Sequence, residues 1–231
     1  MAETLIAESQ KVNTKKARKR AKILTLAPSK FLNPNQDQLK RVFDVIVSGV
    51  LFVVVFSWLF PLIALLIKLD SKGPVFFRQL RHGKNNVPFY CYKFRTMHPN
   101  READFKQATK NDPRVTRLGA ILRKTSLDEL PQFINVLLGE MSIVGPRPHA
   151  MPMNDRFSAE ITNFMYRHTV KPGITGLAQA KGFRGETKNF YDIYSRCKLD
   201  IFYVDNWSLL LDLKIIVWTA VSLLIKKTEV Y

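Results

Sequence analysis

The chain has 231 residues, and its 36 lysines and arginines outnumber 19 aspartates and glutamates to give a formal net charge of +17. This length predicts one folded domain with smaller attached segments. The two cysteines cannot form a disulfide framework, and the four histidines lack the spacing of a zinc site. The charge instead points to an anionic partner, either a membrane surface or nucleic acid.

The first 39 residues are expected to form a disordered basic arm. Residues 1–41 contain ten basic and three acidic residues, and the lysine-rich run 11–20 has too little apolar surface to fold alone. Such an arm is attracted to anionic membrane lipid. Nucleic acid is the competing partner, but the chain shows no zinc-finger, RNP-type or helix-turn-helix pattern. We therefore expect anionic lipid, and no nucleic acid, at the arm.

Residues 40–70 contain an apolar segment that is expected to enter a membrane. Its 23 uncharged residues, 45–67, would form a helix that matches a hydrocarbon core roughly 30 Å thick. Basic residues flank both ends, whereas a spanning helix usually has them mainly on one side. Pro61 breaks the helical pattern, and Ser57 is the nearest hydroxyl that could bind the backbone groups freed there. A re-entrant helix satisfies these facts, although the residue pattern alone leaves a simple crossing open.

A short β-hairpin is predicted after this segment. Residues 75–79 and 89–95 are rich in aromatic side chains, and glycine, asparagine and proline lie between them. Lys93 and Arg95 would share one face of the second strand, where both could bind an anion. A solvent-exposed strand edge is the plainer alternative.

Two helices are predicted in the middle of the chain. The spacing of Leu118, Ile121 and Leu122 indicates an apolar face on a helix over residues 115–124. A second helix is expected to end at Leu138, with Gly139 as its stop signal.

Asp128 and Glu129 lie between these helices and allow two interpretations. Ser126 and Glu129 match a capping box, in which the acid serves only the helix. Pro131 argues that the helix starts nearer Asp128, which would leave both acids exposed at its N-terminus. Arginines and lysines surround the pair in the sequence, and cations with a carboxylate and magnesium suit phosphate chemistry. The spacing alone favours the capping box.

The remaining segments complete an α+β pattern, mostly helical with a small β-hairpin. Residues 144–148 place Arg147 between two prolines on a stiff loop, and residues 171–176 form another turn-rich loop. Residues 206–218 are apolar but carry two charges, which is typical of a helix at a membrane interface. Packing in the core is the alternative for this last segment.

Six runs of residues, taken in order, resemble the bacterial sugar transferase family, the monotopic phosphoglycosyl transferases that act on polyprenyl phosphate. The runs lie at 40–44, 73–79, 92–97, 122–132, 144–148 and 171–176. The resemblance implies a cytosolic catalytic domain over residues 71–231 that ends in an interfacial helix. It also implies a re-entrant membrane helix over residues 40–70, at the cytoplasmic face of the bacterial inner membrane. In one departure, the family often has serine directly before the break proline, whereas Phe60 precedes Pro61 here.

The resemblance implies a reaction in two steps. A carboxylate attacks the β-phosphate of a UDP-sugar and releases UMP, and undecaprenyl phosphate then takes the sugar phosphate. Asp128 matches the family's nucleophile and Glu129 its partner acid, and both are implied ligands of Mg²⁺. The expected substrate-binding residues are Lys93, Arg123 and Arg147, which match the family's phosphate-binding positions, and Arg95, which the strand pattern adds.

The implied role is the initiating step of exopolysaccharide or other surface glycan synthesis. Residues 182–187 and 206–214 favour glucose 1-phosphate, while UDP-galactose and UDP-N-acetyl sugars stay open because hydroxyl contacts decide the sugar. A noncatalytic membrane adaptor, with an arm that binds lipid or nucleic acid, is the alternative from another class. The pair Asp128 and Glu129 among cations argues against it. A homo-oligomer is compatible with the sequence but not required by it.

Overall fold

The computed structural model describes residues 34–99, 109, 112–183, 185 and 190–225. Most of the expected basic arm, residues 1–33, lies outside the described residues. Residues 34–39, which the expected arm included, belong to the first described helix. The described part is mostly helical with two small two-stranded sheets, which confirms the α+β expectation.

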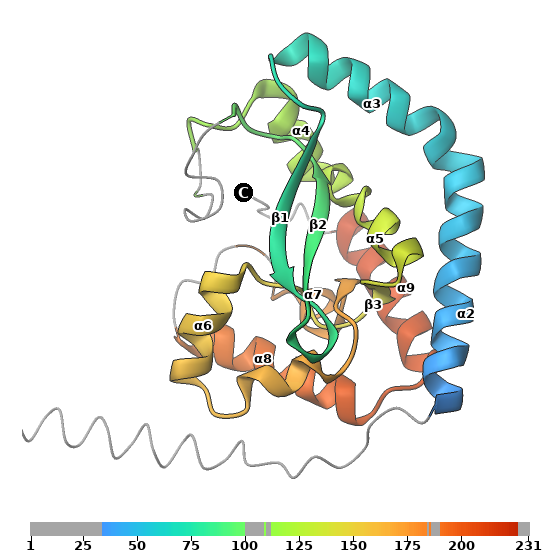
Figure 1. The fold of residues 1–231 in the computed structure, drawn as a ribbon, viewed down its shortest axis with the longest axis vertical. Helices are drawn as coiled ribbons and strands as arrows, with labels where there is room; N and C mark the ends of the chain where they lie inside the picture. Colours follow the sequence, from blue (N-terminus) through green and yellow to red (C-terminus); the bar gives the residue numbers. More distant parts are fainter. Residues whose placement is uncertain (1–33, 100–108, 110–111, 184, 186–189, 226–231) are drawn as a thin grey trace, which may run out of the picture.

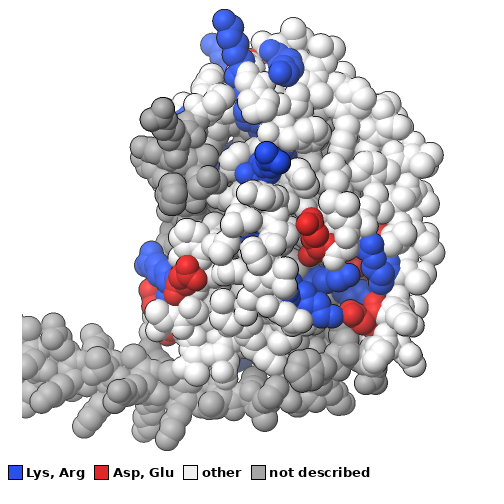
Figure 2. All heavy atoms as spheres, viewed as in Figure 1, with Lys and Arg blue, Asp and Glu red and all other residues white. Residues whose placement is uncertain are grey.

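A long helical arc forms one edge of the molecule. It consists of α2 (Pro34–Leu51), the π-helical η2 (Phe52–Phe56) and α3 (Ser57–Asp70), which run continuously for 37 residues. Figure 1 shows the arc rising along α2 and then bending over the top of the molecule. Within the described ranges it is the one helix long and apolar enough to cross a membrane, and only 17% of its most apolar window is buried. Residues 45–67 of the arc contain no charged side chain, and the upper right-hand edge of the molecule is white in Figure 2, so the arc is a candidate for membrane insertion.

The arc bends around a widened turn and a proline. The backbone N–H of Ser57 donates to the carbonyl of Phe52, five residues earlier, as in a π-helix. The Ser57 hydroxyl donates to the next carbonyl, that of Val53, at 2.8 Å. Such turns and prolines are common causes of helix kinks, and Pro61 follows closely. The Ser57 hydroxyl therefore donates to a carbonyl of the π turn. It was expected instead to bind a backbone group freed by Pro61.

The predicted hairpin is present and packs against the arc. Strands β1 (Phe76–His82) and β2 (Pro88–Phe94) pair antiparallel, with Phe77 opposite Lys93. The short helix η3 (Lys84–Asn86) makes the turn between them. The ring of Phe94 lies 5.1 Å from that of Phe60 and 5.5 Å from that of Phe76, measured between ring centroids. Aromatic packing therefore fixes the end of β2 beside the bend of the arc.

The two predicted helices are α4 (Arg117–Thr125) and α5 (Gln132–Leu138). Gly139 ends α5 in the left-handed region at φ 85°, as its stop signal predicts. The capping box is wrong, because Ser126 itself adopts φ 59° at the end of α4 and its side chain makes no capping hydrogen bond. Asp128 and Glu129 instead lie on η4 (Leu127–Glu129), a single 3₁₀ turn between the two helices.

The lower half of the molecule is built around a short parallel pair of strands. β3 (Ser142–Val144) pairs with β4 (Gly173–Thr175), and a core cluster that includes Val136, Val144 and Ile215 surrounds them. The surrounding helices are α6 (Met151–Glu160), η5 (Phe164–Thr169), α7 (Leu177–Ala180), α8 (Phe190–Asp205) and α9 (Leu209–Ile225). In Figure 1, α6 and α8 lie at the bottom of the molecule, away from α3 at its top.

The C-terminal helix α9 combines both alternatives that its sequence left open. Asp212 and Ile215 are fully buried, so one side of α9 packs in the core. Leu210, Val217 and Val221 are exposed on the described surface, so α9 also presents apolar side chains outward.

Candidate active site

Apolar neighbours place the acidic pair. Leu127 and Leu130 pack against a cluster that includes Ile63 of the arc and Phe94 of the hairpin. Because these leucines flank Asp128 and Glu129 in a single turn, their burial holds both carboxylates at the junction of arc, hairpin and α4. Asp128 is only 8% exposed.

Glu129 brings two of the expected cations together. The Lys93 ammonium donates to its Oε1 at 2.6 Å, and Nη2 of Arg147 donates to the same oxygen at 2.5 Å. Nη1 of Arg147 donates to Oε2 at 3.1 Å, which makes the Arg147 contact bidentate. Three residues predicted from separate motifs therefore meet at one place, although they come from β2, from η4 and from the loop after β3.

The pKa values of the two neighbouring acids are shifted in opposite directions. Burial raises the pKa of Asp128 to about 6, with Lys93 acting against the rise and the charge of Glu129 adding to it. Burial also acts to raise the pKa of Glu129, but Arg147 and Lys93 hold that pKa well below its usual range. No hydrogen bond or ion pair to the Asp128 carboxylate is found within the described residues. Glu129 is thus an ion-paired carboxylate, whereas Asp128 is a buried carboxylate without such a partner among the described residues.

Arg123 supplies a further cation from the last turn of α4. Its Nη1 is buried and has no hydrogen-bond partner in the described part of the chain. Burial lowers the pKa of Arg123, while the charge of Asp128 acts to raise it. A buried guanidinium nitrogen without a partner is unfavourable, so an anionic oxygen bound beside Asp128 would satisfy it.

Arg95 has a different place from the one expected. Strand β2 ends at Phe94, and the Arg95 guanidinium donates to the carbonyls of Lys72 and Ser71 at 2.5 and 2.7 Å. These carbonyls follow the end of α3, where the helix leaves its backbone acceptors open. The Lys93 ammonium and the Arg95 guanidinium therefore contact different groups in this structure, whereas strand alternation led us to expect both at one site.

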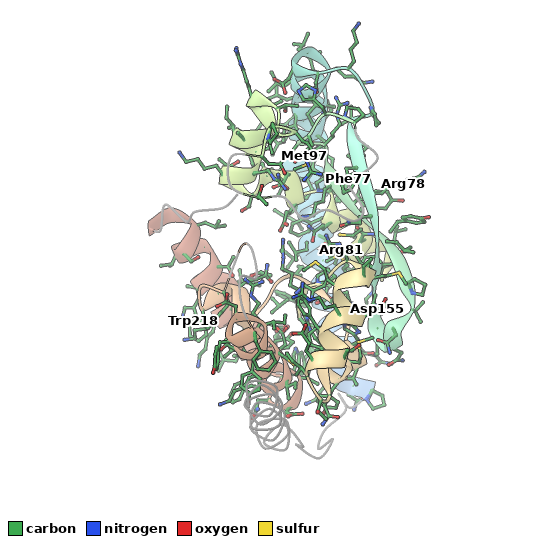
Figure 3. The ribbon with its side chains drawn as sticks, turned by 90° about the vertical axis from the view of Figure 1, so that its left-hand side faces the viewer. Phe77, Arg78, Arg81, Met97, Asp155 and Trp218 are labelled. Carbon is green, nitrogen blue, oxygen red and sulfur yellow. The ribbon has the colours of Figure 1, made fainter. Side chains whose placement is uncertain are left out.

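Two arginines that the sequence analysis missed, the half-buried Arg81 and the buried Arg167, hold the loop of Arg147. Arg81 of β1 donates to the Pro148 carbonyl, and Arg167 of η5 donates to the Arg147 carbonyl at 2.5 Å. In Figure 3, Arg81 lies near the middle of the view between α6 and α9, with Trp218 on α9 to its left. Neither arginine belongs to a recognisable pattern, and only the folded chain brings them to this loop.

The donor set allows a limited metal site. The described residues contain no group of three or more His, Cys, Asp or Glu side chains able to hold a metal ion. Mg²⁺ in phosphate-transfer sites is commonly bound by one or two carboxylates together with water and substrate phosphates. Asp128 fits that requirement with open oxygens, whereas both oxygens of Glu129 are already bound by cations.

Comparison with known proteins identifies the family. A sequence model described as bacterial sugar transferase matches residues 35–226. A relative from Xanthomonas campestris pv. campestris, named UDP-glucose:undecaprenyl-phosphate glucose-1-phosphate transferase, is 52% identical over 184 residues, which cover 78% of this chain and 38% of that protein. A relative of the same name from Caulobacter vibrioides is 49% identical over 189 residues, covering 81% of this chain and 70% of that protein.

A third relative, the exopolysaccharide production protein PSS of Rhizobium leguminosarum bv. phaseoli, is 47% identical over 189 residues, covering 80% of this chain and 94% of that protein. The chain spans about two fifths of the length of the Xanthomonas campestris relative and of two further relatives of the same name. The family match extends from the start of α2 through α9 and includes the acidic pair and all the cations described above. This chain belongs to the bacterial sugar transferase family.

Proposed function

We propose that the chain transfers a sugar 1-phosphate, with glucose 1-phosphate favoured, from a UDP-sugar to undecaprenyl phosphate. The observation that carries the proposal is the pairing of two unlike acids: a buried, unbonded Asp128 beside a Glu129 that gathers Lys93 and Arg147. The names of the relatives support the donor, the acceptor and a role in exopolysaccharide production. The transfer would initiate the synthesis of an exopolysaccharide or another surface glycan.

In the first step, a carboxylate oxygen of Asp128 attacks the β-phosphorus of the UDP-sugar. A bond forms between that oxygen and phosphorus, the bond from phosphorus to the bridging oxygen breaks, and its electron pair leaves with UMP. Lys93, Arg123 and Arg147 lie beside the attacked phosphate and neutralise its charge, which would otherwise repel the carboxylate. The product is an aspartyl phosphosugar.

In the second step, an oxygen of undecaprenyl phosphate attacks the same phosphorus. The bond between phosphorus and the Asp128 oxygen breaks, and its electron pair restores the carboxylate. Because no proton has to be moved in either step, the site needs cations and an ionised Asp128 more than it needs a general base.

Glu129 prepares the cations for the donor. Before substrate binds, its carboxylate occupies the place beside Lys93 and Arg147 that phosphate oxygens would take. A pyrophosphate group offers both cations equivalent anionic oxygens, so they can exchange partners without losing a charge-assisted hydrogen bond. The Glu129 carboxylate would then be released from both side chains and could bind a cation that balances the added negative charge.

We propose Mg²⁺ as that balancing charge, held by Asp128 and Glu129 together with phosphate oxygens. When bound, it supplies Lewis-acid neutralisation of the donor pyrophosphate. Its contribution is testable without turnover, because addition of Mg²⁺ should increase the affinity for UDP-glucose and this increase should be lost in Asp128→Asn.

The arc and α9 are proposed to seat the site on the cytoplasmic face of the bacterial inner membrane. The bent apolar arc supports a re-entrant arrangement over residues 40–70, and the exposed Leu210, Val217 and Val221 of α9 support an interfacial position for that helix. Anionic lipid would hold the basic N-terminal segment. Cysteines introduced at Gln36 and Lys72 should both be labelled from the cytoplasmic side, and labelling from opposite sides would establish a crossing.

The reaction is tested with purified protein in detergent, Mg²⁺, UDP-glucose and undecaprenyl phosphate. UMP and lipid-linked sugar should form together and only with the lipid acceptor, and Asp128→Asn should abolish both products. Asp155→Asn, at an exposed aspartate of α6 that Figure 3 labels, is the matched control and should turn over normally. A lack of product with UDP-glucose, UDP-galactose and UDP-N-acetyl sugars alike would favour the membrane adaptor instead.

A further inference from the structure

The loop that carries Arg147 is tied at every position from Gly145 to His149. The N–H of Gly145 donates to the Thr175 carbonyl at 2.8 Å, and the carbonyl of Pro146 accepts from the N–H of Gly173 at 3.0 Å. The next three residues are held by the two arginines already named: Arg147 and Pro148 through their carbonyls, and His149 through its ring. The backbone is therefore fixed on both sides of Arg147, and its side chain alone extends to Glu129.

Arg167 makes two of these five contacts. Its Nη2 donates to the Arg147 carbonyl, and its Nη1 lies 2.7 Å from Nδ1 of His149. Burial and the charge of Arg167 lower the pKa of His149 well below its usual range, so the ring is neutral and its Nδ1 accepts the hydrogen bond. One planar guanidinium therefore sets both the carbonyl of Arg147 and the side chain two residues later.

The charge of Arg167 is balanced from α8. Asp200 places Oδ2 at 2.8 Å from the Arg167 Nη2, and the two side chains are only 1% and 4% exposed. Burial raises the pKa of Asp200 to about 6, with Arg167 acting against the rise. A buried ion pair is a weak source of stability, since a hydrophobic pair of similar volume often serves the fold equally well. A hydrophobic pair would not, however, supply the directed N–H donors that hold the Arg147 loop.

We propose that Arg167, with its charge balanced by Asp200, is a positioning residue for Arg147. It acts through the backbone of Arg147 and the ring of His149 and fixes the phosphate-binding guanidinium before substrate arrives. The kinetic consequence rests on the proposed function, whereas the positioning itself does not. A small displacement of a pre-set charged group can lower the rate by up to about a hundredfold.

The test compares Arg167→Lys with Arg156→Lys, a change at an exposed arginine on α6 that pairs with Glu160 one turn away. Lysine keeps the positive charge beside Asp200 but cannot hold two acceptors in one plane. Arg167→Lys should lower kcat by about 10- to 100-fold with a smaller change in KM, while the control stays at the wild-type rate. Asp200→Asn keeps the Arg167 guanidinium and should give a smaller loss in kcat. This variant replaces Arg167→Lys in the test if Arg167→Lys does not fold.

A double-mutant comparison separates positioning from general support of the fold. If Arg167 acts through Arg147, its replacement should change the rate of the Arg147→Ala variant by less than about twofold. Equal fold losses in both backgrounds would overturn the proposal, because they would show that Arg167 does not act through Arg147.

A spectroscopic measurement tests the positioning even if the proposed reaction fails. In protein labelled with ¹⁵N-arginine, the Arg147 guanidinium should give a distinct, slowly rotating signal because Glu129 holds it in a bidentate pair. Arg167→Lys should broaden or shift that signal, and Arg156→Lys should leave it unchanged. An unchanged Arg147 signal in Arg167→Lys would refute the inference. If the signal changes as expected but the wild-type protein shows no turnover, only the proposed function is refuted.

Discussion

Asp128→Asn should make the protein more stable at neutral and alkaline pH. The Asp128 pKa of about 6 exceeds the ordinary value of 3.8, a difference worth about 3 kcal/mol of unfolding free energy. Because the folded state holds this proton more tightly than the unfolded chain does, wild-type stability falls as the pH rises from about 4 to about 6. Asparagine has no charge to bury, so the variant does not suffer this loss.

The expected gain depends on pH. It should be about 3 kcal/mol near pH 8, or about 6–12 °C in Tm for a chain of this size, and below about 1 kcal/mol near pH 4. Thermal unfolding in detergent, followed by tryptophan fluorescence at both pH values, measures it, with Asp155→Asn as the exposed control. A variant no more stable than wild type near pH 8, or a gain of equal size at both pH values, would refute the reasoning. A stabilised but inactive variant is expected where a site keeps an unfavourable charge for its chemistry.

Three other substitutions test the structure. Glu129→Gln leaves Lys93 and Arg147 without their anion and should lower the free energy of unfolding by about 2–4 kcal/mol and reduce turnover. Thermal unfolding and UMP release measure the two effects, and unchanged stability would contradict the ion pairing. Asp212→Asn breaks the ion pair between Asp212 and Lys40, whose side chains are 0% and 6% exposed, respectively. It should lower the free energy of unfolding by about 3–5 kcal/mol, measured with urea, and a loss below about 1 kcal/mol would contradict the importance of this pair. Gly119→Ala would place Cβ 2.0 Å from the Thr96 carbonyl oxygen and should lower the free energy of unfolding by about 1–3 kcal/mol. Unchanged stability would show that the backbone shifts there without cost.

The parts of the structure that sequence predicted well have local causes. The hairpin follows from aromatic strands around a turn-rich segment, and α5 stops where Gly139 adopts a positive φ. The spacing on α4 was right for Leu122, which is buried, and for Leu118, which packs against the same cluster, but wrong for Ile121, which is 58% exposed. Each of these signals acts within a few residues, so no knowledge of the rest of the fold was needed.

The errors came from groups that satisfy distant partners. Strand alternation could not show that Arg95 turns to the carbonyls after α3, because those acceptors lie more than twenty residues earlier. The capping box failed because Ser126 takes a left-handed conformation to end α4, which leaves its side chain unable to cap the next turn. Arg167 had no local signal at all, since its value lies in contacts with residues 147 and 200.

The strand before the Arg147 loop is also tied to the proposed membrane anchor. Asp44 of α2 accepts from the N–H of Ile143 at 3.0 Å and from the Ser142 hydroxyl at 3.1 Å. The Tyr203 hydroxyl lies 3.0 Å from the Val144 carbonyl and accepts from Lys40 of α2 at 3.1 Å.

Ser142 and Ile143 of β3 are thus bonded directly to α2, and Val144 lies beside a tyrosine hydroxyl that Lys40 of α2 contacts. A tilt of α2 relative to the rest of the domain would break these buried bonds, which are costly to leave unmade. These bonds therefore couple α2 to the strand that leads into the Arg147 loop. Under the proposed function, in which a water-soluble donor reacts with a lipid phosphate, this coupling would help to fix the depth of the Arg147 guanidinium relative to the membrane surface.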